Sequence, residues 1–102
     1  MLFLYVVQIN YIGPFLLTHL LVEQLLAARP SRIVNTVCHA ARIGTVRLDD
    51  LNHQQLKEGE EYKMQEMYAQ SKLALSLFTR QMAHYLEGKA LHSCNCSLYS
   101  NM

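Results

Sequence analysis

Two side chains that can carry acid–base chemistry, Tyr68 and Lys72, stand four residues apart in the run Tyr-Ala-Gln-Ser-Lys. At this spacing two side chains share one face of a helix, about 6 Å apart at Cβ. A nearby ammonium stabilises a phenolate, so Lys72 is expected to lower the pKa of Tyr68 and make it an acid or base near neutral pH. The spacing also arises by chance, and the alternative is an exposed amphipathic pair on a helix.

Cysteine and histidine side chains offer two further candidate sites, and neither is favoured. Cys94 and Cys96 follow His92 closely, but a Cys-x-Cys pair is tighter than the usual spacing of structural zinc ligands and a fourth ligand is missing. Cys38 and His39 are adjacent, and neighbours along a strand point to opposite faces, which separates a nucleophile from its base. We therefore predict no metal site. Three cysteines, an odd number, indicate a reducing, intracellular compartment.

Charged residues are few, balanced and unevenly placed along the chain. Nine basic and eight acidic side chains give a formal net charge of +1, which leaves no field to attract nucleic acid. Residues 1–28 contain one charged side chain, Glu23, and residues 90–102 contain none. Half of the 102 residues are apolar (51%), which is enough for a single core. The composition is that of a small globular domain.

The apolar amino-terminal segment allows several interpretations. Residues 1–7 have the length of a signal-peptide core but lack its basic flank and its small-residue cleavage site. A membrane-spanning helix is disfavoured because polar or helix-breaking residues interrupt any window of about 20 residues. These are Gln8, Asn10, Gly13, Pro14, His19 and Glu23. A buried strand or helix is expected, and a segment lying on a membrane surface stays open as an alternative.

Hydrophobic periodicity and helix-breaking residues divide the chain into four main elements. A helix over residues 15–28 is apolar around most of its circumference, so it needs cover on two sides. Residues 31–37 are typical of a short buried parallel strand, and residues 38–62 of a long polar loop. A second helix is predicted over residues 64–86, with Gly88 as its carboxy-terminal cap. This helix–strand–loop–helix order predicts an α/β protein.

Several runs occur in an order that identifies a family resemblance. They are residues 9–18, 32–35, 39–44 and 49–52, and then 68–75 with 77–80. Together they resemble the short-chain dehydrogenase/reductase family, most closely its retinol-dehydrogenase-like branch. The resemblance implies a partial, incomplete Rossmann-like fold with a doubly wound parallel sheet. It makes residues 1–88 the central part of the family's domain and residues 89–102 a divergent carboxy-terminal tail.

The family's four catalytic positions fall on particular residues of this chain. The resemblance places the asparagine that holds a relay water at Asn10 and the acid–base tyrosine at Tyr68. The lysine that contacts the nicotinamide ribose falls on Lys72, so Tyr68 and Lys72 are also the expected cofactor contacts. The serine that positions the substrate carbonyl is replaced by Cys38. A thiol is a weak hydrogen-bond donor, so reduced activity is expected.

The chain departs from the family pattern in two regions. The family's glycine-rich turn, which receives the cofactor pyrophosphate at a helix N-terminus, has no counterpart among the scattered glycines. They are Gly13, Gly44, Gly59 and Gly88. The Asn-Asn-Ala-Gly stretch that supports the family's sheet is also missing. In the tail, Ser93 stands where the family has a proline.

Two functions of different classes follow from this resemblance. The first is an oxidoreductase that moves hydride between NADP or NAD and a small apolar alcohol or carbonyl compound, such as a retinoid, steroid or lipid aldehyde. The second is an inactive remnant that forms homo- or heterodimers through the helices 15–28 and 64–86. The missing glycine-rich turn favours the second for the isolated chain. The branch implies a cytoplasmic location, or one peripheral to endoplasmic reticulum or mitochondrial membranes, although no anchor is expected within this sequence.

Overall fold

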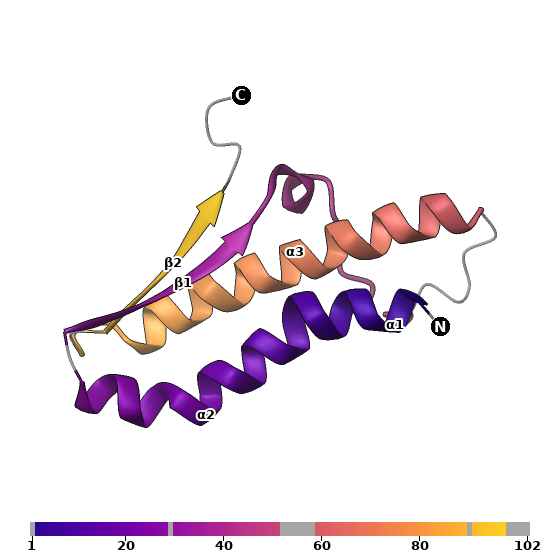
Figure 1. Cartoon of the computed structure of the whole chain (residues 1–102). Coiled ribbons are helices and arrows are strands. Elements are labelled where there is room, and N and C mark those ends of the chain that lie inside the picture. The colour runs from indigo at the N-terminus through magenta and orange to yellow at the C-terminus, as the bar shows by residue number, and fades with distance from the viewer. Residues whose placement is uncertain (1, 29, 52–58, 90, 98–102) are drawn as a thin grey trace.

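The computed structural model describes residues 2–28, 30–51, 59–89 and 91–97, which form two long helical rods and a small parallel sheet (Figure 1). In chain order the elements are α1 (Leu2–Val7), the π-helical turn η1 (Gln8–Ile12), α2 (Gly13–Ala27), β1 (Ser31–Val37), the 3-10 turn η2 (His39–Arg42), α3 (Glu60–Tyr85) and β2 (Leu91–Ser97). This mixture of helix and strand is compatible with part of a Rossmann-like fold. Within the described ranges the sheet has two strands, so a full doubly wound sheet is not shown.

The first rod runs without a break from α1 through η1 into α2 (Figure 1). A proline inside a helix removes one backbone hydrogen bond, and its ring crowds the carbonyl group four residues earlier. Pro14 therefore opposes a regular α-helix around Asn10, and the chain widens into a π-turn there. The Gly13 N–H donates to the Gln8 carbonyl, five residues earlier. A Cβ on residue 13 would lie 3.2 Å from that oxygen, so glycine suits the position.

The hydropathy of this rod corrects the expectation that polar or helix-breaking residues interrupt every apolar window of membrane-spanning length. A 23-residue helix, Tyr5–Ala27, is long and apolar enough to cross a membrane by length and composition. It is covered on one side rather than on two: Thr18 is buried, whereas Leu16 and Leu20 are exposed. The apolar surface expected to face a second layer therefore faces solvent in this structure.

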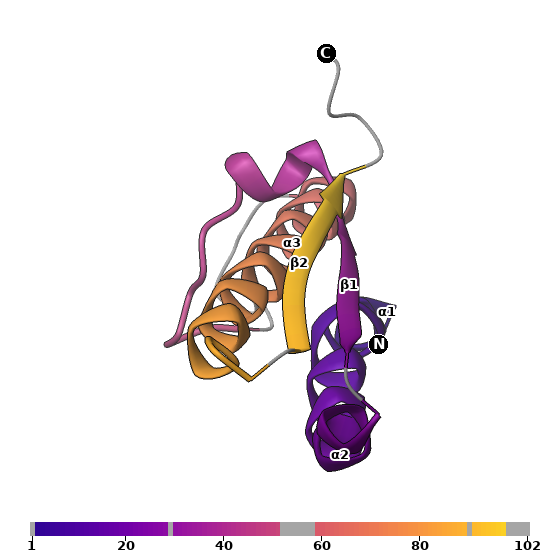
Figure 2. The same ribbon diagram turned by 90° about the vertical axis from the view of Figure 1, so that its left-hand side faces the viewer.

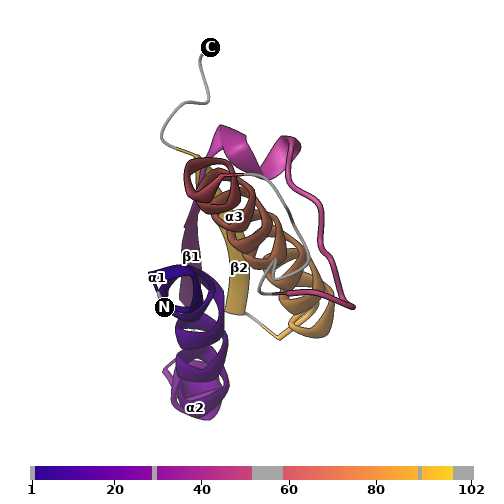
Figure 3. The ribbon, with the colours of Figure 1, turned by 90° about the vertical axis from the view of Figure 1, so that its right-hand side faces the viewer.

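The two strands form a parallel pair that joins distant parts of the chain. The bounds of β1 match the predicted strand, and its register runs from Ser31 opposite Leu91 to Val37 opposite Ser97. No element was expected in the tail, so the strand Leu91–Ser97 is a difference from the sequence-based expectation. Parallel strands need a long crossover, which the loop and α3 supply. Figures 2 and 3 show α2 beside β1 and α3 beside β2, which leaves the opposite sheet face open.

The core lies between α3 and the helix-facing side of the sheet. Its buried side chains are Val37, Leu75, Phe78, Met82, Leu86 and Leu91. A polar contact crosses the same interface, because the Asn35 amide donates to the Thr79 hydroxyl at 2.9 Å. The helix α3 begins four residues before its predicted start, and it ends at Tyr85. Gly88 has the left-handed φ of 76° expected of a residue that turns the chain after a helix.

The expected loop between β1 and α3 contains the turn η2 and then packs closely on α3 at Gly44. A Cβ on residue 44 would lie 2.5 Å from the carbonyl oxygen of Ala69 and 2.8 Å from its carbonyl carbon. Both contacts are with backbone atoms of a helix, which cannot move independently. This approach therefore seats the loop beside the turn of α3 that carries Tyr68.

We predict that Gly44→Ala lowers the free energy of unfolding by about 1–3 kcal/mol, because an added methyl group must displace the helix backbone. Urea titration followed by circular dichroism measures this loss. Gly59→Ala is the matched control, since nothing lies within 4 Å of a Cβ at residue 59. Residue 59 is the N-cap of α3, where alanine caps a helix slightly less well than glycine. Alanine also lowers the conformational entropy of the unfolded chain, and this small gain in stability nearly offsets the capping loss. Equal losses for the two variants would contradict the proposed close approach.

Candidate active site

Tyr68 lies on α3 beside the carboxyl end of β1. The strand ends at Val37, and Cys38 follows it in an extended conformation. The Cys38 thiol donates to the Tyr68 phenol oxygen across 3.5 Å, which is a weak hydrogen bond. Cys38 is half-buried and Tyr68 is 41% exposed, so a small molecule can reach both. Ligands of parallel α/β sheets bind at the carboxyl ends of the strands, which is where this pair lies.

Lys72 lies one helical turn after Tyr68 and points to the same end of β1. Its Nζ donates to the carbonyl oxygen of Thr36 at 3.1 Å and lies 5.8 Å from the centre of the Tyr68 ring. This backbone hydrogen bond holds the long lysine side chain in place. The structure therefore brings together three of the four predicted site residues, while their catalytic roles remain predictions.

Asn10, the fourth predicted residue, reaches α3 through Ser71. The Asn10 amide donates to the Ser71 hydroxyl at 3.1 Å, and that hydroxyl donates to the Tyr68 carbonyl at 2.7 Å. The π-turn η1 carries Asn10 toward α3, so the turn that Pro14 favours places a half-buried polar group against that helix. In this structure Asn10 is linked to the Tyr68 backbone through a buried hydroxyl.

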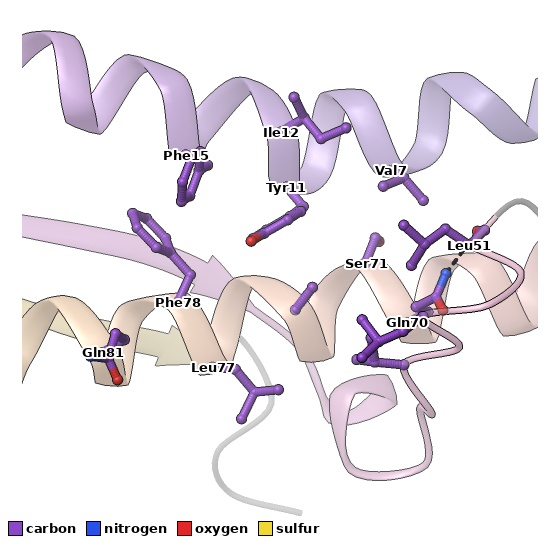
Figure 4. Close-up of a pocket in the computed structure, with 13 residues that line it drawn as sticks. Val7, Tyr11, Ile12, Phe15, Leu51, Gln70, Ser71, Leu77, Phe78 and Gln81 are labelled. Carbon is purple, nitrogen blue, oxygen red and sulfur yellow. Dashed lines mark hydrogen bonds between the residues drawn. The ribbon is translucent and has the colours of Figure 1, made fainter.

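Two residues with positioning contacts, Gln70 and Ser71, had no predicted role. The side chain of Gln70 is almost fully buried; it accepts from the Arg47 N–H at 2.8 Å and donates to the Leu51 carbonyl at 3.0 Å (Figure 4). These bonds tie the loop after η2 to α3. Both residues lie within the Tyr-Ala-Gln-Ser-Lys run. Two adjacent polar residues in the middle of a helix are the sequence feature that could have indicated their buried hydrogen bonds.

Among the described side chains, the other cysteine and histidine candidates do not form a cluster, and the side chain of Cys96 lies outside them. Within the described parts of the chain, no group of three or more His, Cys, Asp or Glu side chains could hold a metal ion. His92 and Cys94 lie two residues apart on β2, a spacing of nearly 7 Å along a strand. His39 is exposed in η2, while the thiol of Cys38 is directed to Tyr68.

An apolar cavity opens between the two helical rods (Figure 4). Its volume is about 640 Å³, and aromatic side chains from both rods, Tyr11, Phe15 and Phe78, meet at one end. Phe15 and Phe78 lie 5.0 Å apart between ring centres. Gln70 and Ser71 are the polar groups at the other end, close along α3 to Tyr68. Cys38, Tyr68 and Lys72 are not among the residues that line it, so this apolar surface is separate from the acid–base pair.

Comparison with known proteins shows consistent similarity over most of the chain. It is 43% identical over 83 residues to retinol dehydrogenase 13 of Mus musculus, covering 81% of this chain and 24% of that protein. It is 43% identical over 81 residues to dehydrogenase/reductase SDR family member 13 of Bos taurus, covering 79% and 21%. Retinol dehydrogenase 11 of Homo sapiens is 40% identical over 86 residues, covering 83% and 25%.

The chain spans about a quarter of the length of these curated relatives. No protein-family model matches it, and no solved structure matches it closely enough to be significant. The similarity to these relatives therefore concerns a segment that includes Cys38, Tyr68 and Lys72, and it rests on sequence identity.

Proposed function

Because the chain belongs to the short-chain dehydrogenase/reductase family, in its retinol-dehydrogenase-like branch, we propose that it carries the acid–base site of an NAD(P)-dependent oxidoreductase. The proposed substrate is an apolar alcohol or carbonyl compound of the retinoid, steroid or lipid aldehyde class. The observation that carries this proposal is the meeting of Cys38, Tyr68 and Lys72 at the carboxyl end of β1.

Each residue of this group has a distinct task in the proposed reaction. Tyr68 exchanges a proton with the substrate oxygen, and the ammonium of Lys72 stabilises the phenolate that forms. Cys38 lies against the same phenol, so its S–H orients a substrate carbonyl placed there. Asn10 holds its place through Ser71, whose hydroxyl is bonded to the Tyr68 backbone and keeps that turn of α3 in position.

The residues present fit one end of a nicotinamide cofactor. Lys72 and Tyr68 lie side by side at an accessible strand end, where they would contact the nicotinamide ribose. When bound, the cofactor supplies or accepts the hydride. The described residues include no glycine-rich turn for the pyrophosphate: Gly13 lies inside a helical rod, Gly44 packs on α3, and Gly88 follows the end of α3. Binding by this chain is therefore expected to be weak.

Titration calorimetry with NADPH tests the proposal directly. We expect a Kd in the millimolar range, because only the ribose end of the cofactor is held. We expect Lys72→Met to weaken binding about tenfold or more, since it removes a charged hydrogen-bond donor. Lys63→Met is the matched control on the same helix and is expected to bind like the wild type. Absence of heat at millimolar NADPH would contradict the enzyme proposal.

The thiol at the usual serine position yields a second test. We predict that Cys38→Ser raises retinal reduction about two- to tenfold, because a hydroxyl donates a stronger hydrogen bond than a thiol. Initial rates at saturating NADPH measure the change. Cys94→Ser, an exposed cysteine on β2, is the control and should leave the rate unchanged. An unchanged or lower rate for Cys38→Ser would remove Cys38 from the substrate site.

A second candidate function is that of an inactive module that pairs with a full-length relative through its helices. Large apolar side chains exposed along the two rods favour it, among them Leu16 on α2 and Leu77 on α3. The cavity between the rods extends this apolar surface (Figure 4). Co-expression with a full-length relative and affinity purification tests the pairing. Failure to co-purify would contradict it, and NADPH binding without pairing would favour the enzyme.

A further inference from the structure

The thiol of Cys38 is a nucleophile that the proposed hydride transfer does not use as one. Its Sγ donates to the Tyr68 phenol oxygen across 3.5 Å, and Lys72 Nζ lies 5.8 Å from the centre of the same ring. Cys38 is half-buried and Tyr68 is 41% exposed, so solvent reaches this pair at the end of β1. Sulfur is intrinsically a far stronger nucleophile than a hydroxyl oxygen. The site therefore combines a reactive nucleophile with an acid that can activate a carbonyl group.

The chain on both sides of Cys38 is held in place, which fixes the position of the sulfur. Val37 before it is buried in the core, and Lys72 Nζ donates to the Thr36 carbonyl at 3.1 Å. The Cys38 carbonyl accepts from the Ala41 N–H at 3.1 Å, where the turn η2 begins. A nucleophile held in this way has less conformational freedom to lose when it attacks a bound molecule. The sulfur and the phenol oxygen therefore form a preorganised pair.

The separation of these two atoms indicates which class of molecule can engage both. In an α,β-unsaturated aldehyde the carbonyl oxygen and the electrophilic β-carbon are about 3–4 Å apart, from ordinary bond lengths. The Cys38 sulfur and the Tyr68 phenol oxygen are 3.5 Å apart, which matches that separation. A carbonyl oxygen bound to the Tyr68 hydroxyl therefore allows the β-carbon to come within attack distance of the sulfur. A saturated aldehyde has no electrophilic carbon at that position.

We propose that Cys38 covalently captures 2-alkenals, the α,β-unsaturated members of the lipid aldehydes, with Tyr68 as the acid. This proposal rests on the proposed function for the position of the substrate oxygen on Tyr68, and it requires no cofactor. The capture is specific to this thiol. Cys94, the other free cysteine among the described side chains, is exposed on β2 and donates to the Ile33 carbonyl at 3.8 Å, a group that cannot protonate a substrate.

The addition balances without an oxidant or a reductant. The sulfur forms a C–S bond to the β-carbon, and the electron pair of the C=C bond shifts toward the carbonyl group to give an enol. The Tyr68 O–H gives its proton to the carbonyl oxygen, and the Cys38 S–H replaces that proton along their hydrogen bond. The ammonium of Lys72 stabilises negative charge that develops on the phenol oxygen. The enol then gains a proton at the α-carbon and loses the one on oxygen, which leaves a saturated thioether aldehyde.

The test measures adduct formation on the full 102-residue chain without cofactor. The chain is mixed with trans-2-nonenal, the adducts are fixed with borohydride, and tandem mass spectrometry of the peptides gives the rates at Cys38 and Cys94. We expect Cys38 to react at least about tenfold faster, although Cys94 is the more exposed thiol. Nonanal, the saturated control, should leave no stable adduct on Cys38. Equal rates at the two cysteines would overturn the proposal.

Two tyrosine variants test the role of the phenol. Tyr68→Phe is expected to slow the addition of 2-nonenal to Cys38 at least about tenfold and to leave the rate at Cys94 unchanged, whereas Tyr62→Phe should alter neither rate. Methyl methanethiosulfonate, which has no carbonyl group, should modify Cys38 at similar rates in Tyr68→Phe and wild type. If Tyr68→Phe slows both reagents equally, or slows neither, the proposal is overturned.

These measurements separate the capture from the proposed oxidoreductase function, because neither reagent requires NADPH or turnover. Capture at Cys38 that depends on Tyr68, in a chain that does not reduce retinal, would support this proposal and contradict the oxidoreductase function. Retinal reduction by a chain whose Cys38 does not react with 2-nonenal would overturn this proposal alone.

Discussion

Tyr68→Phe is expected to reduce the NADPH-dependent reduction of retinal at least about a hundredfold, the usual contribution of a positioned acid or base. The substitution removes the phenol oxygen that meets the Cys38 thiol and leaves the ring beside Lys72. Tyr68 is 41% exposed, and the hydrogen bond between its hydroxyl and the Cys38 sulfur is weak, so the stability of the chain should change little. Absorbance at 340 nm measures the rate, and thermal unfolding verifies the fold.

Tyr62→Phe is the matched control for this result. Tyr62 lies on the same helix, six residues earlier, with a similar exposed fraction, and it is far along α3 from the end of β1. Its variant should keep the wild-type rate. Equal rates for Tyr68→Phe and wild type would contradict the acid–base role, and a wild-type chain without turnover would leave the inactive pairing module as the function.

The site residues on α3 were predictable because helix geometry is local. Tyr68 and Lys72 are four residues apart, and a helix alone places them on one face. The strand Ser31–Val37 was predictable for a similar reason, since its β-branched residues follow a proline. These features depend on residue type and spacing, which a sequence displays directly.

The π-turn and the strand β2 depend on contacts between distant residues. Pro14 opposes a regular helix at Asn10, but the resulting π-turn is seen only when Asn10 meets Ser71, 61 residues away. The run Leu91–Ser97 contains no β-branched residue. It becomes a strand because β1 offers a backbone edge and because Leu91 is fully buried in the core. A polar run of this kind has no local pattern that predicts a strand.

The contact between the two helical rods is expected to contribute strongly to the stability of the fold. Phe78→Ala is expected to lower the free energy of unfolding by about 3–5 kcal/mol, the usual cost of removing a buried aromatic ring. The ring is buried, lies 5.0 Å from Phe15 and 6.5 Å from Tyr11 between centres, and joins α3 to the first rod. A loss of this size should lower the melting temperature by about 15 °C or more.

Leu77→Ala separates this effect from a general change in helix propensity. Leu77 is the preceding residue of α3 and is about half exposed, so its variant should lose less than about 1 kcal/mol. If Phe78→Ala does not fold, Phe78→Leu keeps most of the apolar volume and should show an intermediate loss in calorimetry. Equal losses at positions 77 and 78 would mean that the rods do not pack through Phe78. The orientation of Asn10 toward Ser71 would then lack its structural support, because the Asn10–Ser71 hydrogen bond crosses the same interface as the ring contacts of Phe78.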